Sequence, residues 1–411
     1  MMWFFLFLSL CAISFKDWMF FSSMFFIDGF TVFIISIIPL VLIMILLFHF
    51  NYSSTDEMLI YYSSFFFILL FVFAVFLVNH SFLFIFFIEM CVYLMSFLIL
   101  FYSKDLDKYA STLFMFTLNI LGSIPFLLFS TLLTDTSFTF SLFNQVFSLS
   151  YVSNMIMFFS FFLILVSKLP LMFFHFWLTK AHVSASGSCS MILASLMLKL
   201  GSFGFYKFFL FFFFCSLLTF NMTVSLSLFS CLFFCLLMLR FSDMKHLIAC
   251  SSILHMSLIF PLTGSGFTPG IFSSMFMMVG HGLVSYFLFF LVTLLYEFSY
   301  GRSMDLNKSQ ESFTKSILMM LFIFLFLNIG FPPFLNFYSE VGFCLFLLSF
   351  SLISLIIFCL TMTFSILFTM YLISKSIFGK KHSFFLLEND GTVNFFSLKL
   401  LYSLLVLSFI T

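Results

Sequence analysis

The chain has 411 residues, of which 64% are hydrophobic and 8% are charged, and its formal net charge is +1. Soluble domains carry about 25% charged residues, so the composition excludes a soluble globular protein. The small net charge gives no electrostatic basis for binding nucleic acid or an acidic partner. Apolar runs of roughly 18 residues or more recur along the chain, and short alternating strands are absent. These features predict an all-α polytopic membrane protein.

Two residue types add to this picture. The chain contains 79 Phe but only seven Ala. Phenylalanine codons are thymine-rich and alanine codons need G and C, so the bias indicates an AT-rich organelle genome. The nine cysteines lie mostly within apolar runs and form no C-x-x-C pair. Cys231 and Cys235 stand one helical turn apart, and we interpret them as packing residues because no His or Asp lies near them.

We expect about thirteen membrane helices with short connectors. The expected helices fall near 2–15, 26–50, 57–79, 81–102, 110–133, 151–179, 188–214, 219–239, 245–263, 269–297, 314–337, 341–375 and 394–410. The longest connectors, 134–150, 298–313 and 376–393, are rich in polar residues. With this count, the basic residues of the connectors and helix ends gather on one side, which the positive-inside rule assigns to the matrix or cytoplasm. They are Lys104, Lys108, Lys180, Arg240, Lys245, Arg302, Lys308, Lys315, Lys375, Lys380 and Lys381, and the loops of the opposite side hold only Lys16.

Prolines are expected to break two helices in mid-membrane. One break falls at Lys168-Leu169-Pro170 and the other at Pro332-Pro333. Interrupted backbone at this depth is tolerated only where it is buried in protein or lines a water-filled cavity. Each broken helix is the fourth member of a block of five, and because five is odd the second block must be inverted, as in ion-coupled transporters. The predicted regions are N-terminal helices in 1–56, a first repeat in 57–218, a second, inverted repeat in 219–376, and a C-terminal loop and helix in 377–411.

Only four charged residues sit well inside apolar runs: Glu89, Lys168, Lys199 and Glu340. A charge at the centre of a lipid-embedded helix costs about 2.5–3.5 kcal/mol to insert, so four together point to a function. Three histidines, His175, His255 and His281, are embedded as well. Glu89 and His255 both occupy the second helix of their blocks, and Lys168 and Glu340 are assigned to the fourth. Lys199 and His281 fall between these positions in sequence. We therefore expect a polar line across the bilayer, parallel to its plane, from Glu89 to Glu340.

Such a line would support proton transfer. The proton affinity of a buried lysine responds to a nearby carboxylate, so a movement of Glu89 relative to Lys168 would change the lysine's readiness to release its proton. Histidine titrates close to neutrality and can pass a proton through either ring nitrogen. The chain carries no nucleotide-binding loop, metal-ligand cluster or c-type haem motif. No cofactor or metal site is therefore predicted.

Each member also has a structural interpretation. A single embedded histidine is often a packed core residue, and a buried Glu–Lys pair can be a structural salt bridge. Asn336, one helical turn before Glu340, can cap the end of a broken helix. Lys180 and His182 lie at a helix terminus, where contact with the last carbonyls is a sufficient role. We therefore count His175, Lys180, His182 and Asn336 as secondary candidates.

Several stretches resemble the antiporter-like membrane subunits of respiratory complex I. The stretches are K-L-P-L-M-F-F-H-F-W-L-T-K-A-H-V, S-M-I-L-A-S-L-M-L-K-L-G-S-F-G, D-M-K-H-L-I-A-C-S-S-I-L-H-M, V-G-H-G-L and P-P-F-L-N-F-Y-S-E, which together span about 167–340, and F-F-I-E extends the match to about 80. Two departures stand out. The family usually has fourteen helices, one more than we count, and it commonly continues E-A-P where this chain has Ser184-Ala185-Ser186.

The resemblance implies roles for individual residues. Glu89 and Lys168 look like the family's coupled glutamate–lysine pair, and Lys199 like its central proton-carrying lysine. His255 and His281 look like relay histidines, and Glu340 like the terminal glutamate that faces the next subunit. NADH, FMN, iron–sulfur clusters and ubiquinone would be bound by partner subunits. The expected partners are other complex I subunits, especially the antiporter-like subunits 2 and 5, and membrane lipid.

The expected function is proton translocation in the membrane arm of NADH:ubiquinone oxidoreductase, in the mitochondrial inner membrane. Two alternatives stay open at this point. One is a free-standing cation/proton antiporter of the same fold, and the other is a structural scaffold whose buried ion pairs fix helix packing.

Overall fold

The computed structural model describes residues 55–78, 80–103, 105–132, 151–211, 217–264, 268–299, 301–304, 315–332 and 334–378, together with Thr31, Ile35 and Ile38. Within these residues, eight helical spans are long and apolar enough to cross a membrane. The predicted all-α polytopic membrane protein is thereby confirmed. The helices expected near 2–15, 26–50 and 394–410 lie almost wholly outside the described residues, so the count of thirteen stays a prediction.

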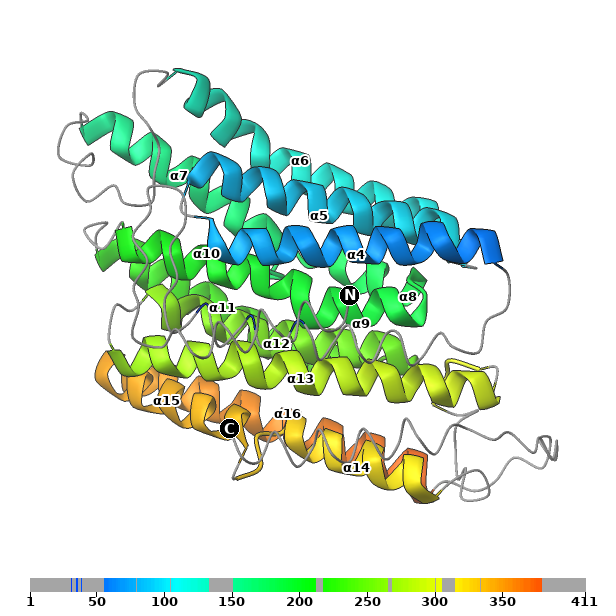
Figure 1. The fold of residues 1–411 in the computed structure, drawn as a ribbon. Helices are drawn as coiled ribbons and strands as arrows, with labels where there is room; N and C mark the ends of the chain where they lie inside the picture. Colours follow the sequence, from blue (N-terminus) through cyan, green and yellow to red (C-terminus); the bar gives the residue numbers. More distant parts are fainter. Residues whose placement is uncertain are drawn as a thin grey trace, which may run out of the picture.

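The described residues form a series of helices in chain order (Figure 1). The first set is α4 (Thr55–Leu77), α5 (Ser81–Tyr102), α6 (Lys108–Leu132), α7 (Tyr151–Lys168), α8 (Phe176–Ser184), α9 (Gly187–Ile192), the π-helix η2 (Leu193–Met197) and α10 (Leu198–Phe211). The second set is α11 (Leu217–Met238), α12 (Met244–Gly264), α13 (Thr268–Ser299), α14 (Lys315–Asn328), α15 (Leu335–Phe350) and α16 (Leu352–Phe378).

The hydroxyl groups of small polar residues in the helices form hydrogen bonds with carbonyls of their own helix. The hydroxyls of Ser227, Ser230 and Ser257 each donate to the backbone carbonyl three residues earlier, at 2.8, 2.7 and 2.7 Å. A bilayer offers no water to these groups, so a serine in a membrane helix needs an acceptor on its own helix or a neighbour. These hydrogen bonds explain how apolar helices tolerate so many hydroxyl groups.

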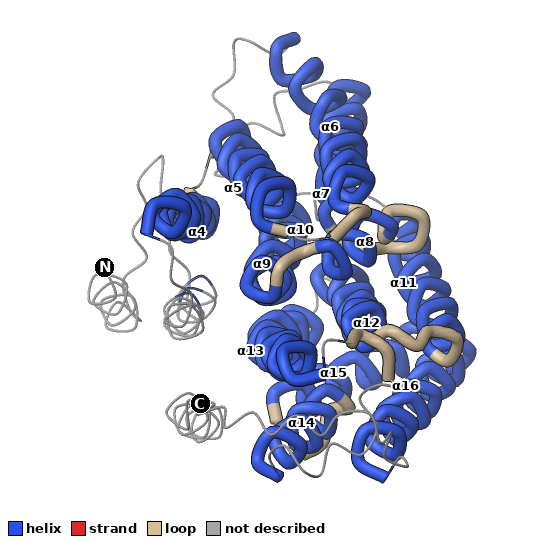
Figure 2. Tube along the Cα trace, turned by 90° about the vertical axis from the view of Figure 1, so that its right-hand side faces the viewer, coloured by secondary structure: helices blue, strands red, loops and turns tan. Residues whose placement is uncertain are grey.

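The centre of the bundle is formed by α10, α12 and α13. These helices are almost entirely buried, whereas α16 exposes apolar side chains such as Leu352 and Ile353, which are 68% and 73% exposed. Figure 2 shows α5 and α6 at one end of the cross-section and α14, α15 and α16 at the other, with α10, α12 and α13 between them. A helix that is apolar all round is suited to the inside of such a bundle.

The first break separates α7 from α8. Helix α7 ends at Lys168, two residues before Pro170, and α8 begins at Phe176. Between them Phe173 takes a positive φ of 75°, which is uncommon for a residue with a side chain. This break falls where the sequence predicts it.

The second break differs from the expectation. Helix α14 ends at Asn328, before the prolines, because Gly330 adopts a φ of 79°. The amide of Gly330 donates to the Leu327 carbonyl at 3.3 Å and that of Phe331 to the Phe326 carbonyl at 3.4 Å, the Schellman pattern that glycine favours at a helix end. The rings of Phe326 and Phe331 lie 6.2 Å apart and add the apolar contact of this motif.

The expected helices at 314–337 and 341–375 are therefore wrong in their division. The chain makes α14, α15 and α16 instead, so Glu340 lies within α15, the second half of the broken helix, and not after it. Lys168 ends the first half of its own broken helix. The two residues thus lie on opposite sides of their respective breaks.

Two of the basic residues expected on one side, Arg302 and Lys245, lie close together at the α8–α9 connection. Arg302 donates to the Asp105 carboxylate between α5 and α6, and at 3.3 Å to the Val183 carbonyl in α8. The Lys245 ammonium donates to the Ala185 carbonyl at 3.1 Å. Burial disfavours the charge of Arg302, but its hydrogen bond to Asp105 and the charge of that carboxylate outweigh this effect and raise its pKa.

Candidate functional site

The first part of the site is a buried ion pair between α5 and α7. The Lys168 ammonium lies 3.1 Å from Oε1 of Glu89, and both side chains are nearly enclosed. The other carboxylate oxygen of Glu89 accepts a hydrogen bond from the amide of Asn119 on α6. A buried ion pair is tolerated only when its remaining polar atoms are satisfied, and Asn119 meets part of this need.

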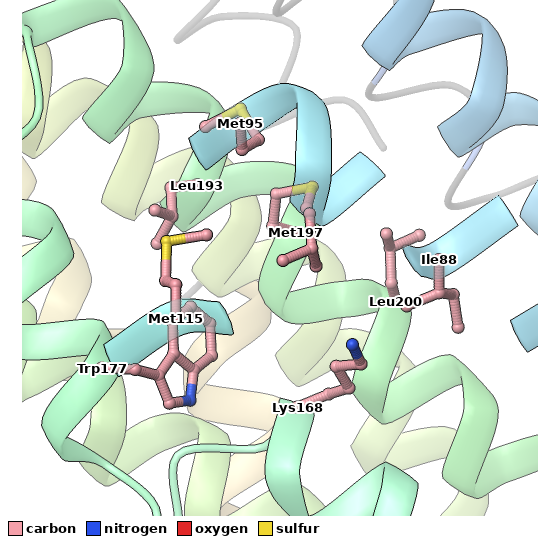
Figure 3. A pocket seen from close by; sticks show the side chains of 9 residues that line it. Ile88, Met95, Met115, Lys168, Trp177, Leu193, Met197 and Leu200 are labelled. Atoms are coloured by element: carbon pink, nitrogen blue, oxygen red, sulfur yellow. The ribbon is translucent and has the colours of Figure 1, made fainter. Parts of the chain in front are cut away.

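A small cavity lies next to Lys168. Its volume of about 20 Å³ is enough to hold one water molecule. Figure 3 shows the Lys168 side chain at this cavity, together with Trp177 from α8 and Met197 and Leu200 from the segment that carries Lys199. Lys168 and residues on both sides of Lys199 in the sequence thus line the same cavity.

The second part of the site is centred on Lys199, whose side chain is 0% exposed. Its ammonium donates to the Ala194 carbonyl at 2.6 Å and lies 3.1 Å from Nδ1 of His281 on α13. Ala194 belongs to the π-helix η2, which directly precedes α10. Single π-helical turns inside α-helices are found frequently at functional sites.

The third part joins α12, α13 and α15. The rings of His255 and His281 have centroids 5.6 Å apart, and Nδ1 of His255 lies 4.0 Å from Oε1 of Glu340. The Glu340 carboxylate packs against Gly330, where an added Cβ would overlap it. The glycine required by the helix end therefore also makes room for the charged group.

Three polar atoms along this series are buried and have no hydrogen-bond partner within the described structure. They are Nε2 of His281, Nδ1 of His255 and Oε1 of Glu340. Buried polar atoms are normally paired, so a series of unpaired ones in one line calls for an explanation. The 4.0 Å separation of His255 and Glu340 is a distance that a bridging water or a small side-chain shift can close.

The six principal residues predicted from the sequence therefore fall into two groups. Glu89 and Lys168 form one, and Lys199, His281, His255 and Glu340 form the other. The cavity beside Lys168 is also lined by Met197 and Leu200, which lie close to Lys199 in the sequence. The two ends expected from the sequence, Glu89 and Glu340, belong to different groups, and the line and the roles of its residues stay predictions.

The secondary candidates take different places. His175 packs among Phe176 and Phe234, with centroids 4.1 and 4.7 Å away, on the α11 side of the break. Lys180 lies over the ring of Phe114 at 3.8 Å. Neither is brought into contact with the line. His182 stacks on Phe289 at 4.5 Å, within electrostatic reach of Lys199.

Asn336, the remaining secondary candidate, lies at the second break. Its amide donates to the Leu327 carbonyl at 3.2 Å, which agrees with the capping interpretation. Its Oδ1 has no partner among the described residues and packs against Gly280, next to His281. Asn336 therefore contacts the residue next to His281 in the sequence.

Sequence reasoning missed two polar residues that the structure places in the interior. Asn119 touches Glu89 directly, and a lone Asn in an apolar helix was the available signal. Lys207 is buried in α10, where its ammonium donates to the Val78 carbonyl at 2.6 Å and lies 4.8 Å from the centroid of the Phe203 ring. Lys207 lies eight residues after Lys199, and the sequence alone did not distinguish it from a charged residue near the end of a helix.

Two broken helices, one ending at Lys168 and the other carrying Glu340, together with the buried Glu89–Lys168 and Lys199–His281 pairs, form the arrangement of an antiporter-like membrane subunit. The family model described as NADH:quinone oxidoreductase/Mrp antiporter, TM, matches residues 78–369. Because this match covers most of the chain, the chain belongs to that family. Among curated relatives it is similar to NADH-ubiquinone oxidoreductase chain 4 of Artemia franciscana, with 37% identity over 231 residues, which are 56% of this chain and 58% of the relative.

Other relatives and solved structures agree. Chain 4 of Apis mellifera ligustica is 34% identical over 57% of this chain and 52% of its own length, so the match spans little more than half of such relatives. The fold resembles a chain of the archaeal membrane-bound sulfane sulfur reductase (TM-score 0.84, 18% identity, 100% of this chain and 88% of that one). It also resembles a chain of respiratory complex I from Thermus thermophilus (TM-score 0.82, 17% identity, 97% and 87%).

Proposed function

We propose that this chain is a proton-translocating membrane-arm subunit of NADH:ubiquinone oxidoreductase in the mitochondrial inner membrane. The observation that carries the proposal is the series of buried ionisable groups from Glu89 to Glu340, which includes successive polar atoms without a hydrogen-bond partner among the described residues. The family match and the names of the chain 4 relatives support it.

In this mechanism a proton passes between Lys168 and Lys199 when Glu89 moves relative to Lys168. The ammonium of Lys168 and its carboxylate partner form a pair whose separation sets how readily the lysine releases its proton. The cavity beside Lys168, which Met197 and Leu200 also line, would hold a water on the way from Lys168 toward the segment that carries Lys199. His281 and His255 then pass the change in charge on to Glu340.

NADH oxidation and quinone reduction would take place in partner subunits, which would also bind FMN, iron–sulfur clusters and ubiquinone. We propose that the neighbours include the antiporter-like subunits 2 and 5. Both charged ends of the line support contact with such neighbours, because Glu89 and Glu340 are carried by α5 and α15, toward opposite ends of the cross-section. A partner at either end would sense the charge of the nearest glutamate.

The test is the variant Lys199→Met in the assembled complex, with proton pumping and NADH:quinone activity measured side by side. Methionine keeps the apolar length of the side chain and removes the ammonium. We expect normal assembly with a loss of pumping and of coupled turnover. Unchanged pumping would reject the proton path and leave the scaffold interpretation. Cation/proton exchange by the isolated chain would instead favour a free-standing antiporter.

A matched control is Lys375→Met. Lys375 lies in the last turn of α16, where its ammonium is 5.6 Å from the Tyr371 ring, away from the line. This variant removes the same charge and should leave pumping unchanged.

A further inference from the structure

Each of the two broken helices has a side-chain hydrogen bond that crosses its own break. In the first, the indole Nε1 of Trp177 donates to the Ser167 carbonyl at 3.1 Å. Ser167 is the last residue but one of α7, and Trp177 is the second residue of α8. The donor thus belongs to the second half-helix and the acceptor to the end of the first.

The second break repeats this arrangement with different chemistry. The amide Nδ2 of Asn336 donates to the Leu327 carbonyl at 3.2 Å. Leu327 is the last residue but one of α14, and Asn336 is the second residue of α15. Donor and acceptor therefore occupy the same positions relative to the break as Trp177 and Ser167.

These positions have a physical reason. The last carbonyls of a helix have no partner within it, and in the interior of a membrane protein water is not generally available to them. A side-chain donor in the opposite half-helix satisfies the carbonyl and at the same time fixes the two halves relative to one another. Indole and carboxamide are both uncharged at any pH of interest, so the link does not depend on protonation.

We propose that Trp177 and Asn336 are matched positioning residues, each of which holds one charged residue of the polar line, Lys168 or Glu340, in place across its break. This inference rests on the proposed function, because the line is what they would position.

The first link acts on Lys168. Ser167, its acceptor, is the residue directly before that lysine, and Gly201 of α10 packs so closely on Lys168 that an added Cβ would lie 3.0 Å from the lysine Cβ. Trp177 also lines the cavity beside Lys168 (Figure 3). A shift of α8 against α7 would therefore alter both the lysine position and the space for water.

The second link acts on Glu340 and reaches the relay. The Leu327 carbonyl accepts from Asn336 and also from the Gly330 amide, and Gly330 supports the Glu340 carboxylate. Asn336 Oδ1 meanwhile packs on Gly280, the residue before His281. One side chain thus touches the turn that seats Glu340 and the helix that carries His281.

The test uses the assembled complex with two variants that remove a donor and keep most of the volume: Trp177→Phe and Asn336→Leu. The readout is the number of protons translocated per NADH oxidised, because a purely structural role lowers the amount of complex without changing this ratio. The loss of one buried hydrogen bond lowers the equilibrium constant for the conformation it stabilises about fivefold. We expect a lower ratio and a fall of about fivefold in coupled turnover in each variant.

Two controls separate the possible failures. Asn221→Leu changes the same residue type on an exposed site of α11 and should leave the ratio unchanged, while Lys199→Met reports on the proposed function itself. A normal ratio in both donor-less variants, with a lowered ratio in Lys199→Met, would overturn this inference alone. A normal ratio in all three would overturn the proposed function and this inference together. Loss of assembly in both donor-less variants would assign the links a structural role and also overturn it.

Discussion

The Lys199 ammonium lies 3.1 Å from Nδ1 of His281 and 2.6 Å from the Ala194 carbonyl. The lysine thus has one neighbour that can take up a proton and one that cannot. This difference matters for the line, because His281 can accept a proton and lies next to His255, which in turn lies next to Glu340.

His281→Phe is expected to interrupt the line while keeping an aromatic ring in the core. The Lys199 side chain would lose the neighbour that accepts its proton, and hydrogen bonds to charged groups are worth about 1.5–3 kcal/mol. We expect coupled turnover to fall about 10- to 100-fold, measured as NADH-driven proton uptake in vesicles. His246→Phe is a suitable control, since its ring packs on Phe241 near the start of α12. Equal turnover in both variants would contradict the relay role.

Asn119→Leu is expected to disturb the Glu89–Lys168 pair. The substitution removes the donor to one oxygen of Glu89 and leaves that oxygen buried, which costs about 1–3 kcal/mol. We expect reduced pumping with the complex still assembled. Thr117→Val gives the comparison, because its hydroxyl donates to the Phe114 carbonyl of its own helix, at 3.3 Å. If Asn119→Leu pumped like the wild type, the amide would have no part in tuning the pair.

Gly330→Ala is expected to be damaging for two reasons that can be separated. A positive φ of 79° costs a residue with a Cβ about 1 kcal/mol or more, and the new methyl group would overlap the Glu340 carboxylate. We expect lower thermal stability and lower pumping. Adding Glu340→Ala should restore the part of the stability that the overlap removes. No recovery in the double variant would show that backbone strain alone accounts for the loss.

Asp105→Asn is expected to have a small effect on stability and none on proton pumping. The Arg302–Asp105 pair is partly exposed, and such pairs contribute about 1 kcal/mol or less. We expect a lower melting temperature at low ionic strength and a smaller difference at high salt, where exposed charges are screened. A large loss of pumping would instead place this pair in the proton route.

Long apolar runs made most helices predictable from the sequence. The expected 81–102 is α5, and 245–263 and 269–297 agree with α12 and α13 to within two residues. The position of the second break was harder to predict. The prolines indicated a break at 332–333, whereas the helix ends earlier because of Gly330, whose effect depends on its φ value. A glycine in sequence does not reveal which φ it will adopt.

The site was predictable to the extent that it depends on charge. A buried lysine or glutamate stands out against an apolar run, and so Glu89, Lys168, Lys199 and Glu340 could be named. Uncharged contributors such as Asn119, Trp177 and the Ala194 carbonyl could not, since their part depends on which helix packs against which. His175 could not be assigned from the sequence either, because only the structure shows that aromatic rings pack against this embedded histidine beside the break.

The π-helical turn before α10 gives Lys199 an acceptor that belongs to its own helix. If α10 slides against α13, the distance to His281 changes, while Ala194 travels along with the lysine. The ammonium can therefore leave its neighbour without being left unsolvated in the core of the protein. The carbonyl that stabilises the Lys199 ammonium thus belongs to the same segment as the lysine, and the proton acceptor, His281, belongs to a separate helix.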